Sequence, residues 1–140
     1  MSVKFLETIM KTKVGSGGFD KALRAMRFIS GGGGNCTAEI KIEKEHLNAG
    51  GNLHGGFTAL VADAVSTYGL MTAESQAPGV SVNLNVSYMK PAREGDVILV
   101  ESVAKKIGKQ LAFCDINIKL KDSDKLIATA SHTKYIGSKL

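Results

Sequence analysis

Residues 55–73 constrain the fold more than any other part of the chain. They read GGFTALVADAVSTYGLMTA, and Asp63 carries the only charge among them. Apolar and small residues would occupy most faces of a helix with this sequence, whereas a surface helix has one polar face. The pattern therefore predicts a helix that the rest of the protein encloses on most sides.

Asp63 is anomalous within this helix. An ionised carboxylate in such surroundings costs a few kcal/mol of desolvation unless another group pairs with it. A helix this apolar would lose little with alanine at the same position. We therefore predict that Asp63 serves catalysis, since perturbed acids mark active sites. A carboxylate hydrogen-bonded inside a core or a subunit contact is the structural alternative.

The second half of the chain alternates with a period of two, as strands do. Residues 80–89 place three of their apolar side chains, Val80, Val82 and Leu84, on one predicted face and Ser81 and Asn83 on the other. Further strands are predicted over residues 97–107, 110–120 and 126–136, with a tight turn at Gly108 and Lys109. An earlier strand is predicted over residues 36–42.

The N-terminal region has helical spacing over residues 5–10 and 19–26, which predicts two short helices. The glycine run at 31–34 is interpreted as a flexible hinge. The fold class is therefore α+β, a single domain over residues 1–140 with a long helix and an antiparallel meander of about five strands. Such a sheet covers only part of the helix and has open edges, so we predict a dimer or a larger assembly with the site where chains meet.

Composition narrows the cellular locations that we expect for the protein. The chain has 140 residues, a net charge of +5 and two isolated cysteines, Cys36 and Cys114, which fit a reducing compartment. No stretch is apolar enough for a membrane span. The basic N-terminus resembles a secretion signal poorly, and its Glu7 makes it a weak mitochondrial presequence. We expect a cytoplasmic protein, with mitochondria as a further location.

Gly55 and Gly56 begin the enclosed helix. The first N–H groups of a helix lack partners within it and lie at the positive end of its dipole, so they can stabilise an oxyanion. Removing one such donor typically raises a barrier by about 2–4 kcal/mol. A flexible start to the helix is the alternative, but Asp63 lies two turns further along the same segment.

Two polar residues could assist the start of the helix and Asp63. The Asn48 amide could donate to the same carbonyl or hold a water, although its surroundings also suit a simple turn. Ser81 could bind a water or Asp63, or could merely belong to a polar strand face.

Other chemistries are poorly supported by the sequence. No Gly-x-Ser-x-Gly sequence exists, and neither cysteine has a histidine near it along the chain. His46, His54 and His132 lack the spacing of metal ligands, so no metal site is predicted.

Basic residues gather at the turns between the predicted strands. Lys90 and Arg93 follow one strand, and Lys105, Lys106 and Lys109 surround the hairpin. They could bind a phosphate-bearing ligand, or they could serve solubility and protect strand edges. Nucleic acid is a poorer explanation, since the few aromatic residues do not interleave with these charges.

Several motifs give the chain a family resemblance. They are the HGG sequence at 54–56, Asp63 on the following helix, PGVSV at 78–82, NVSYMKPA at 85–92, LAF at 111–113 and HTK at 132–134. With these, the chain resembles hot-dog-fold acyl-CoA thioesterases from about residue 41 to residue 135. The resemblance implies a long central helix wrapped by a curved antiparallel sheet, sites shared between two protomers, and dimers that pair into tetramers.

The resemblance also implies roles for particular residues. Gly55 and Asn48 would hold the thioester carbonyl, with His54 supporting the loop. Asp63 from the other protomer would activate the attacking water, with Ser81 helping to place it. Asn83 departs from the family, because close relatives often have an acidic residue there, and we assign it no role. Contacts to coenzyme A would come from Tyr88, Met89, Lys90, Pro91, Ala92, Arg93, Lys106, Ile107, Gly108, Lys109, Gln110, Leu111 and Tyr135.

The leading hypothesis is hydrolysis of medium- to long-chain fatty acyl-CoA to free fatty acid and CoA, with no cofactor other than the CoA of the substrate. A lipid-transfer protein is a further partner that the resemblance implies. Two alternatives stay open: a non-catalytic acyl-CoA binder or regulatory protein, and a hot-dog hydratase or dehydratase. The second would need a histidine beside the acid, and the helix offers none near Asp63 in sequence. A nucleic-acid binder is the remotest option.

Overall fold

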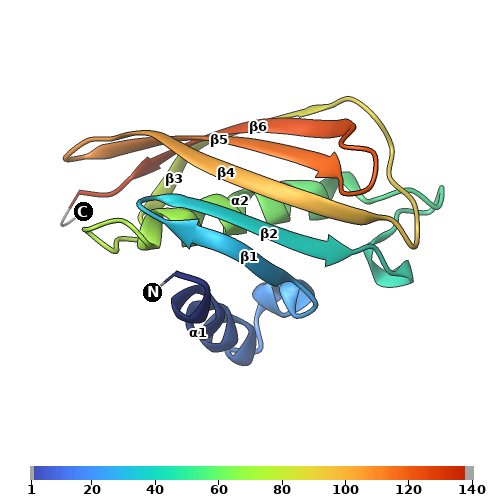
Figure 1. The fold of residues 1–140 in the computed structure, drawn as a ribbon, viewed down its shortest axis with the longest axis horizontal. Helices are drawn as coiled ribbons and strands as arrows, with labels where there is room; N and C mark the ends of the chain where they lie inside the picture. The colour runs from blue at the N-terminus through green and yellow to red at the C-terminus, as the bar shows by residue number, and fades with distance from the viewer. Residues whose placement is uncertain (1, 138–140) are drawn as a thin grey trace.

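A curved six-stranded antiparallel sheet wraps around one long helix in the computed structural model, which describes residues 2–137 (Figure 1). A second helix packs against the outer strand β1 near the N-terminus. Within residues 2–137, no helix is long and apolar enough to cross a membrane. The helical elements are α1 (Ser2–Gly15), η1 (Phe19–Leu23), η2 (Lys44–His46) and α2 (Gly55–Met71), and the strands are β1 (Arg27–Gly32), β2 (Asn35–Lys41), β3 (Val80–Tyr88), β4 (Val97–Ile107), β5 (Leu111–Leu120) and β6 (Leu126–Tyr135).

Helix α2 begins where the sequence predicts. The His54 side chain accepts a hydrogen bond from the Gly56 N–H at 2.8 Å and so caps the first turn. Most side chains of α2 are buried against the sheet, but Leu60, Asp63 and Thr67 are only half-buried and share one stripe at helical spacing. This stripe is the side of α2 that its own sheet leaves uncovered.

The predicted strands agree closely with the observed ones. β4 has the predicted bounds, and β2, β3, β5 and β6 differ from the prediction by a single residue at one or both ends. The predicted layout of a long helix wrapped by an antiparallel sheet is confirmed.

Three predictions about the framework are wrong. The glycines at 31–34 are not a hinge, because they end β1 and turn the chain into β2. The second N-terminal helix is only a short 3-10 helix, η1, and Met26 lies beyond it. The sheet is not a simple meander either: its order is β1-β2-β4-β5-β6-β3, so β3 forms an edge.

Strand β1 escaped prediction because its alternation is broken. Its pairing with β2 shifts register between Phe28 and Ser30, so Phe28 is buried while its neighbour Ile29 and the following Ser30 are both exposed. A bulge of this kind removes the period of two that identifies a strand.

Strand β3 also contains a bulge, which changes the predicted direction of Ser81. The register with β6 shifts between Ser81 and Asn83. Ser81 is paired with Lys134 and Leu84 with His132, and both partners are buried beneath α2. Ser81 therefore shares the helix-facing side with Leu84, whereas simple alternation predicted opposite faces. Bulges commonly redirect a side chain next to a functional site.

The glycine before β3 allows a test of this framework. Gly79 has a φ of +68°, and a Cβ there would lie 2.6 Å from the Tyr135 carbonyl oxygen. Gly95 has a φ of +93° but nothing within 4 Å of its Cβ position. We expect Gly95→Ala to cost about 1 kcal/mol in the free energy of unfolding, from the left-handed backbone alone. Gly79→Ala should cost clearly more, as measured by urea denaturation; equal costs would contradict the close contact with Tyr135.

Candidate active site

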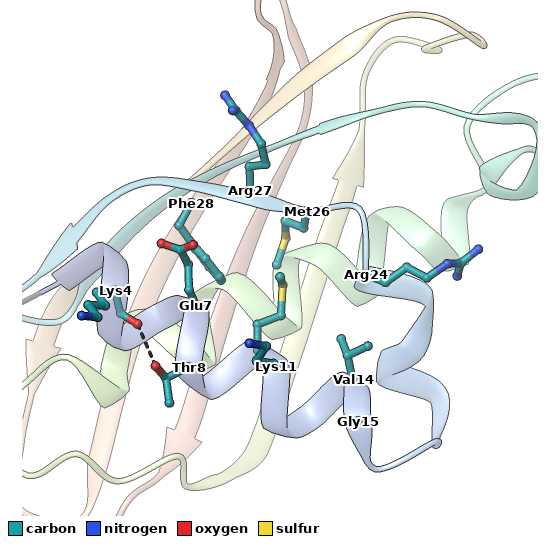
Figure 2. Close-up of a pocket in the computed structure, with 11 residues that line it drawn as sticks. Lys4, Glu7, Thr8, Lys11, Val14, Gly15, Arg24, Met26, Arg27 and Phe28 are labelled. Carbon is teal, nitrogen blue, oxygen red and sulfur yellow. Dashed lines mark hydrogen bonds between the residues drawn. The ribbon is translucent and has the colours of Figure 1, made fainter.

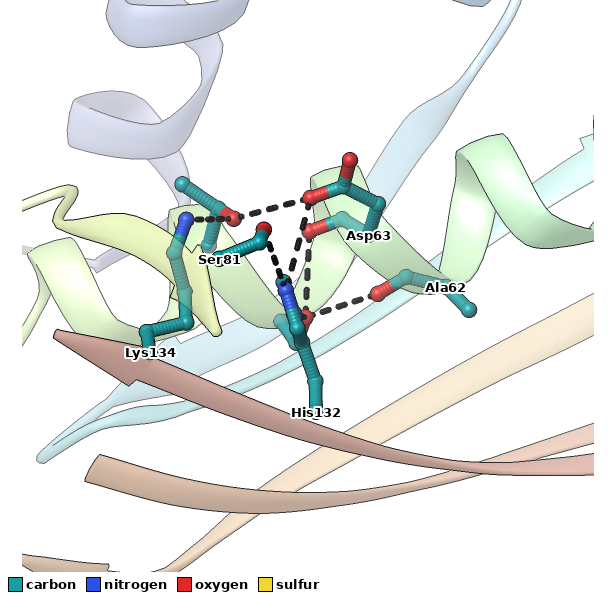
Figure 3. A network of polar contacts seen from close by, with 7 residues as sticks. Ala62, Asp63, Ser81, His132 and Lys134 are labelled. Carbon is teal, nitrogen blue, oxygen red and sulfur yellow. Dashed lines mark hydrogen bonds and ion pairs between the residues drawn. The ribbon is translucent and has the colours of Figure 1, made fainter. Parts of the chain in front are cut away.

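A buried histidine connects α2, β3 and β6 (Figure 3). The Nδ1 atom of His132 lies 2.7 Å from the Ser66 hydroxyl, and its Nε2 atom lies 2.7 Å from the Ser81 hydroxyl. The imidazole is fully buried, and its Nε2 atom is also 3.9 Å from Asp63 Oδ1. One ring therefore connects two serines and approaches the acid that the sequence singled out.

The hydrogen bonds around His132 determine its tautomer. The Ser66 hydroxyl donates to the Ala62 carbonyl at 2.7 Å, so its oxygen accepts from Nδ1–H of His132. Nε2 is then the acceptor for the Ser81 hydroxyl proton. Burial lowers the pKa of His132, although the charge of Asp63 acts in the opposite direction, and the neutral ring fits this arrangement.

Asp63 lies beside this network on the uncovered stripe of α2. Its side chain is 45% exposed, and the Thr67 hydroxyl donates to its Oδ1 at 3.4 Å. Asp63 and Ser81 line one cavity of about 350 Å³, so the structure brings these two predicted residues together. The rest of the lining comes from Lys13, Asp20, Leu60, Ala64, Thr67, Tyr68, Pro78, Gly79 and Lys134.

A second cavity, of about 400 Å³, collects another group of predicted residues. Asn48 and Gly55 line it, and the Tyr88 hydroxyl donates to the Gly55 carbonyl at 2.7 Å. The Asn48 side-chain oxygen accepts from the N–H groups of Gly50 and Asn52. Within residues 2–137, neither the Gly55 N–H nor the Asn48 NH₂ group has a hydrogen-bond acceptor, so both can donate to a ligand. Five predicted CoA contacts line this cavity: Tyr88, Met89, Lys90, Pro91 and Ala92.

The loop before α2 is supported by a histidine that the sequence analysis gave no role. The His46 ring is buried and stacks on Phe57, with 4.4 Å between ring centroids. Its Nδ1 accepts from the Glu43 N–H, and its carbonyl accepts from the His54 N–H. His54 itself is exposed and caps α2, which is consistent with a supporting position.

The remaining predicted residues lie at two ends of the sheet. Arg93 is exposed, and its backbone forms an isolated β-bridge with Asn52 near the second cavity. Leu111 is paired with Tyr135, at the end of β6 opposite to the Ala128 that pairs with Tyr88. The exposed hairpin residues Lys106, Ile107, Lys109 and Gln110 and the half-buried Gly108 belong to the Tyr135 end. Asp63 and Gly55 of one chain thus line different cavities, and the assignment of Asp63 to a partner protomer stays a prediction.

Sequence reasoning missed Ser66, Thr67, His132 and Lys134. Ser66 and Thr67 follow Asp63 by one helical turn, and His132 and Lys134 alternate on the helix-facing side of β6. Helix α2 itself has no histidine near Asp63, as predicted, but the fold places His132 of β6 beside it. His132 is nevertheless enclosed and bonded at both nitrogens, so it does not face a substrate as a hydratase base would.

A third cavity, of about 790 Å³, lies between α1 and β1 and contains none of the predicted site residues (Figure 2). Figure 2 shows Met26 and Phe28 facing α1, whereas Arg27 extends from the other side of β1. Arg27 pairs there with Glu39. Within residues 2–137, no group of three or more histidine, cysteine or acidic side chains could hold a metal ion.

The class of protein follows from this fold and a family match. A sequence profile of the Thioesterase superfamily matches residues 50–127, which include α2, β3 and β4. The chain belongs to the thioesterase superfamily, and it has the predicted hot-dog fold.

Individual relatives match almost the whole chain. Acyl-coenzyme A thioesterase 13 of Mus musculus is 41% identical over 133 residues, which cover 95% of each protein. The crystal structure of zebra fish thioesterase superfamily member 2 is 39% identical, covers 98% of this chain and 99% of its own, and superposes with a TM-score of 0.95. Thioesterase superfamily member 2 from Mus musculus gives a TM-score of 0.89 at 39% identity, covering 96% and 97%. The prediction of a thioester hydrolase is confirmed.

The buried histidines predict how stability depends on pH. Burial lowers the pKa of both His46 and His132, so the unfolded chain takes up protons first as the pH falls below about 6.5. Stability should therefore fall with acidification. We expect the melting temperature of His132→Asn to decrease less than that of the wild type between about pH 7.5 and pH 5.5. Parallel decreases in thermal scans would contradict a neutral, buried His132.

Proposed function

We propose that this thioesterase hydrolyses medium- to long-chain fatty acyl-CoA to free fatty acid and CoA. One observation carries the proposal: the Asp63 carboxylate and the Ser81 oxygen line the same cavity, while neutral His132 accepts the Ser81 proton. Two oxygen acceptors beside one cavity suit a water molecule that must be oriented and deprotonated. The name of the relative from Mus musculus, acyl-coenzyme A thioesterase 13, supports acyl-CoA as the substrate.

The proposed reaction needs no covalent intermediate. Asp63 takes a proton from the water as its oxygen attacks the thioester carbon, and Ser81 accepts the second hydrogen of that water. Negative charge develops on the carbonyl oxygen, where the Gly55 N–H and the Asn48 amide donate. The C–S bond then breaks, and the CoA thiolate leaves with the electron pair. The proton on Asp63 returns to solvent or to the thiolate.

The proposed site needs two copies of the chain. Strand β3 is a sheet edge that exposes apolar side chains, including Val80 and Val82, and α2 leaves a stripe uncovered beside it. Two β3 edges paired antiparallel would extend the sheet and cover both helices. In a two-fold pair, the Asp63 end of one protomer would meet the Gly55 end of its partner. We propose this dimer, and pairs of dimers, as the active assembly.

The CoA contacts, partner and location also remain proposals. Lys90 and Arg93 near the second cavity, with Lys106 and Lys109 on the hairpin, are exposed cations suited to phosphates. Tyr135 would lie at the nucleotide end. A lipid-transfer protein partner and a cytoplasmic location, with mitochondria as a further one, follow from the family resemblance and the composition.

Replacement of Asp63 tests the proposed base. We expect Asp63→Asn to lower kcat by about 10²–10⁴-fold, because general-base catalysis contributes that much. The Kd for a non-hydrolysable acyl-CoA analogue should stay within a few-fold. Thiol release from acyl-CoA substrates of several chain lengths measures kcat, and calorimetry measures the Kd of the analogue.

Asp122→Asn, in the exposed turn after β5, is the control and should behave as wild type. Unchanged turnover in Asp63→Asn would refute the proposed mechanism. Binding without hydrolysis by the wild type would favour the non-catalytic acyl-CoA binder instead.

The proposed dimer is testable at the β3 edge. Val82 is 60% exposed there, so Val82→Glu would place like charges together between two paired edges. We expect a smaller mass in analytical ultracentrifugation and a matching loss of activity. Ile29→Glu, on the exposed side of β1 at the opposite edge, is the control and should change neither. An active Val82→Glu monomer would exclude a site shared between protomers.

A further inference from the structure

Lys134 is a buried cation with an unusual partner. The residue is 4% exposed, and its Nζ donates to the Thr67 hydroxyl at 2.6 Å (Figure 3). Among residues 2–137, no carboxylate lies within ion-pair distance of this amine. Burial lowers the pKa of Lys134, and the charge of Asp63 opposes that effect. A methionine would fill the same space without the desolvation cost, so packing alone does not account for a lysine here.

Thr67 transmits the effect of Lys134 to Asp63. A hydroxyl has one proton, and an ammonium group can only donate, so the Thr67 oxygen accepts from Lys134. The Thr67 proton is then directed at Asp63 Oδ1, 3.4 Å away. Donation by a charged group polarises the hydroxyl and makes it a better donor in turn. The chain of contacts therefore runs in one direction, from Lys134 through Thr67 to Asp63.

These contacts leave the two oxygens of Asp63 in different surroundings. Oδ1 accepts from Thr67 and lies 3.9 Å from His132, and Figure 3 shows the other oxygen pointing away from His132. Among the described residues, Oδ2 has no hydrogen-bond partner. The carboxylate is thus held through one oxygen while the other remains available for a proton.

We propose that Lys134 is a positioning residue of the hydrolytic site, which acts through Thr67 to orient the Asp63 carboxylate and supply an opposite charge to it. The inference rests on the proposed function, because it assigns Oδ2 as the atom that takes the proton of the water. Other titratable groups face the same cavity or Asp63 itself, and the experiment must separate them: His132 on β6, Lys13 on α1, Asp20 on η1 and Tyr68 on α2.

Lys134→Met and Thr67→Val test the relay. We expect kcat with a long-chain acyl-CoA to fall about 10-fold or more in each, because a displaced catalytic group can cost up to about 10²-fold. KM should change less than about two-fold. The double variant should be no slower than the worse single variant, since both changes break one relay. Thr67→Ser keeps the hydroxyl and should restore most of kcat.

Stability and pH separate positioning from a structural role. Lys134→Met should melt at the wild-type temperature or above it, because it removes a buried charge. The acidic limb of its kcat/KM profile should move to higher pH, since a cation that favours the ionised acid is gone. Lys125→Met removes an exposed cation from the turn before β6, outside this cavity, and is the control, for which we expect no such movement.

Other outcomes would overturn the proposal. The relay would be excluded by a wild-type kcat in Lys134→Met, or by losses of kcat in the two single variants that multiply in the double variant. A loss of kcat that follows a loss of melting temperature would make Lys134 structural, and if Lys134→Met fails to fold, the Thr67→Val and Thr67→Ser pair decides alone. Full activity of Asp63→Asn would overturn the proposed function itself. If Asp63→Asn is inactive while Lys134→Met keeps the wild-type kcat, only the inference about Lys134 is overturned.

Discussion

The structure depends on how α2 packs against the sheet. The helix is apolar almost all round, but the single sheet covers only one side of it. The sheet buries most of α2, but the stripe with Leu60, Asp63 and Thr67 stays partly open. Strand β3 ends the sheet beside that stripe. The polar network lies where the helix, the edge strand and β6 meet, so the incomplete cover creates the site.

Periodicity predicted most of the fold because most elements follow it. The apolar run of α2 and the alternation of β3 to β6 each reflect burial against the other layer. Prediction failed where a bulge interrupts that pattern. The register shift near Phe28 hid β1, and the shift after Ser81 turned that serine toward the helix. Pairing order was also inaccessible, since nothing in local sequence says that β3 skips β4 to join β6.

The residues of the candidate site also divide into those that the local sequence could predict and those that it could not. Asp63 could be found because a lone charge in an apolar helix is a local anomaly, and Gly55 because it begins that helix. His132 and Lys134 could not, because polar residues on a strand normally face solvent. Only the register of β6 beneath α2 reveals that both point inward.

The two buried basic residues of β6 act on different oxygen acceptors beside the same cavity. His132 is neutral and fixes the direction of the Ser81 proton, while Lys134 can supply charge to Asp63 through a hydroxyl. These contacts all lie within one chain, so the half proposed to activate water is set before any partner binds. The donors proposed to hold the carbonyl, at Gly55 and Asn48, are likewise set within one chain, but in another cavity. In the proposed dimer each protomer would therefore carry two prepared halves, and a two-fold pair would complete two sites without either chain changing shape.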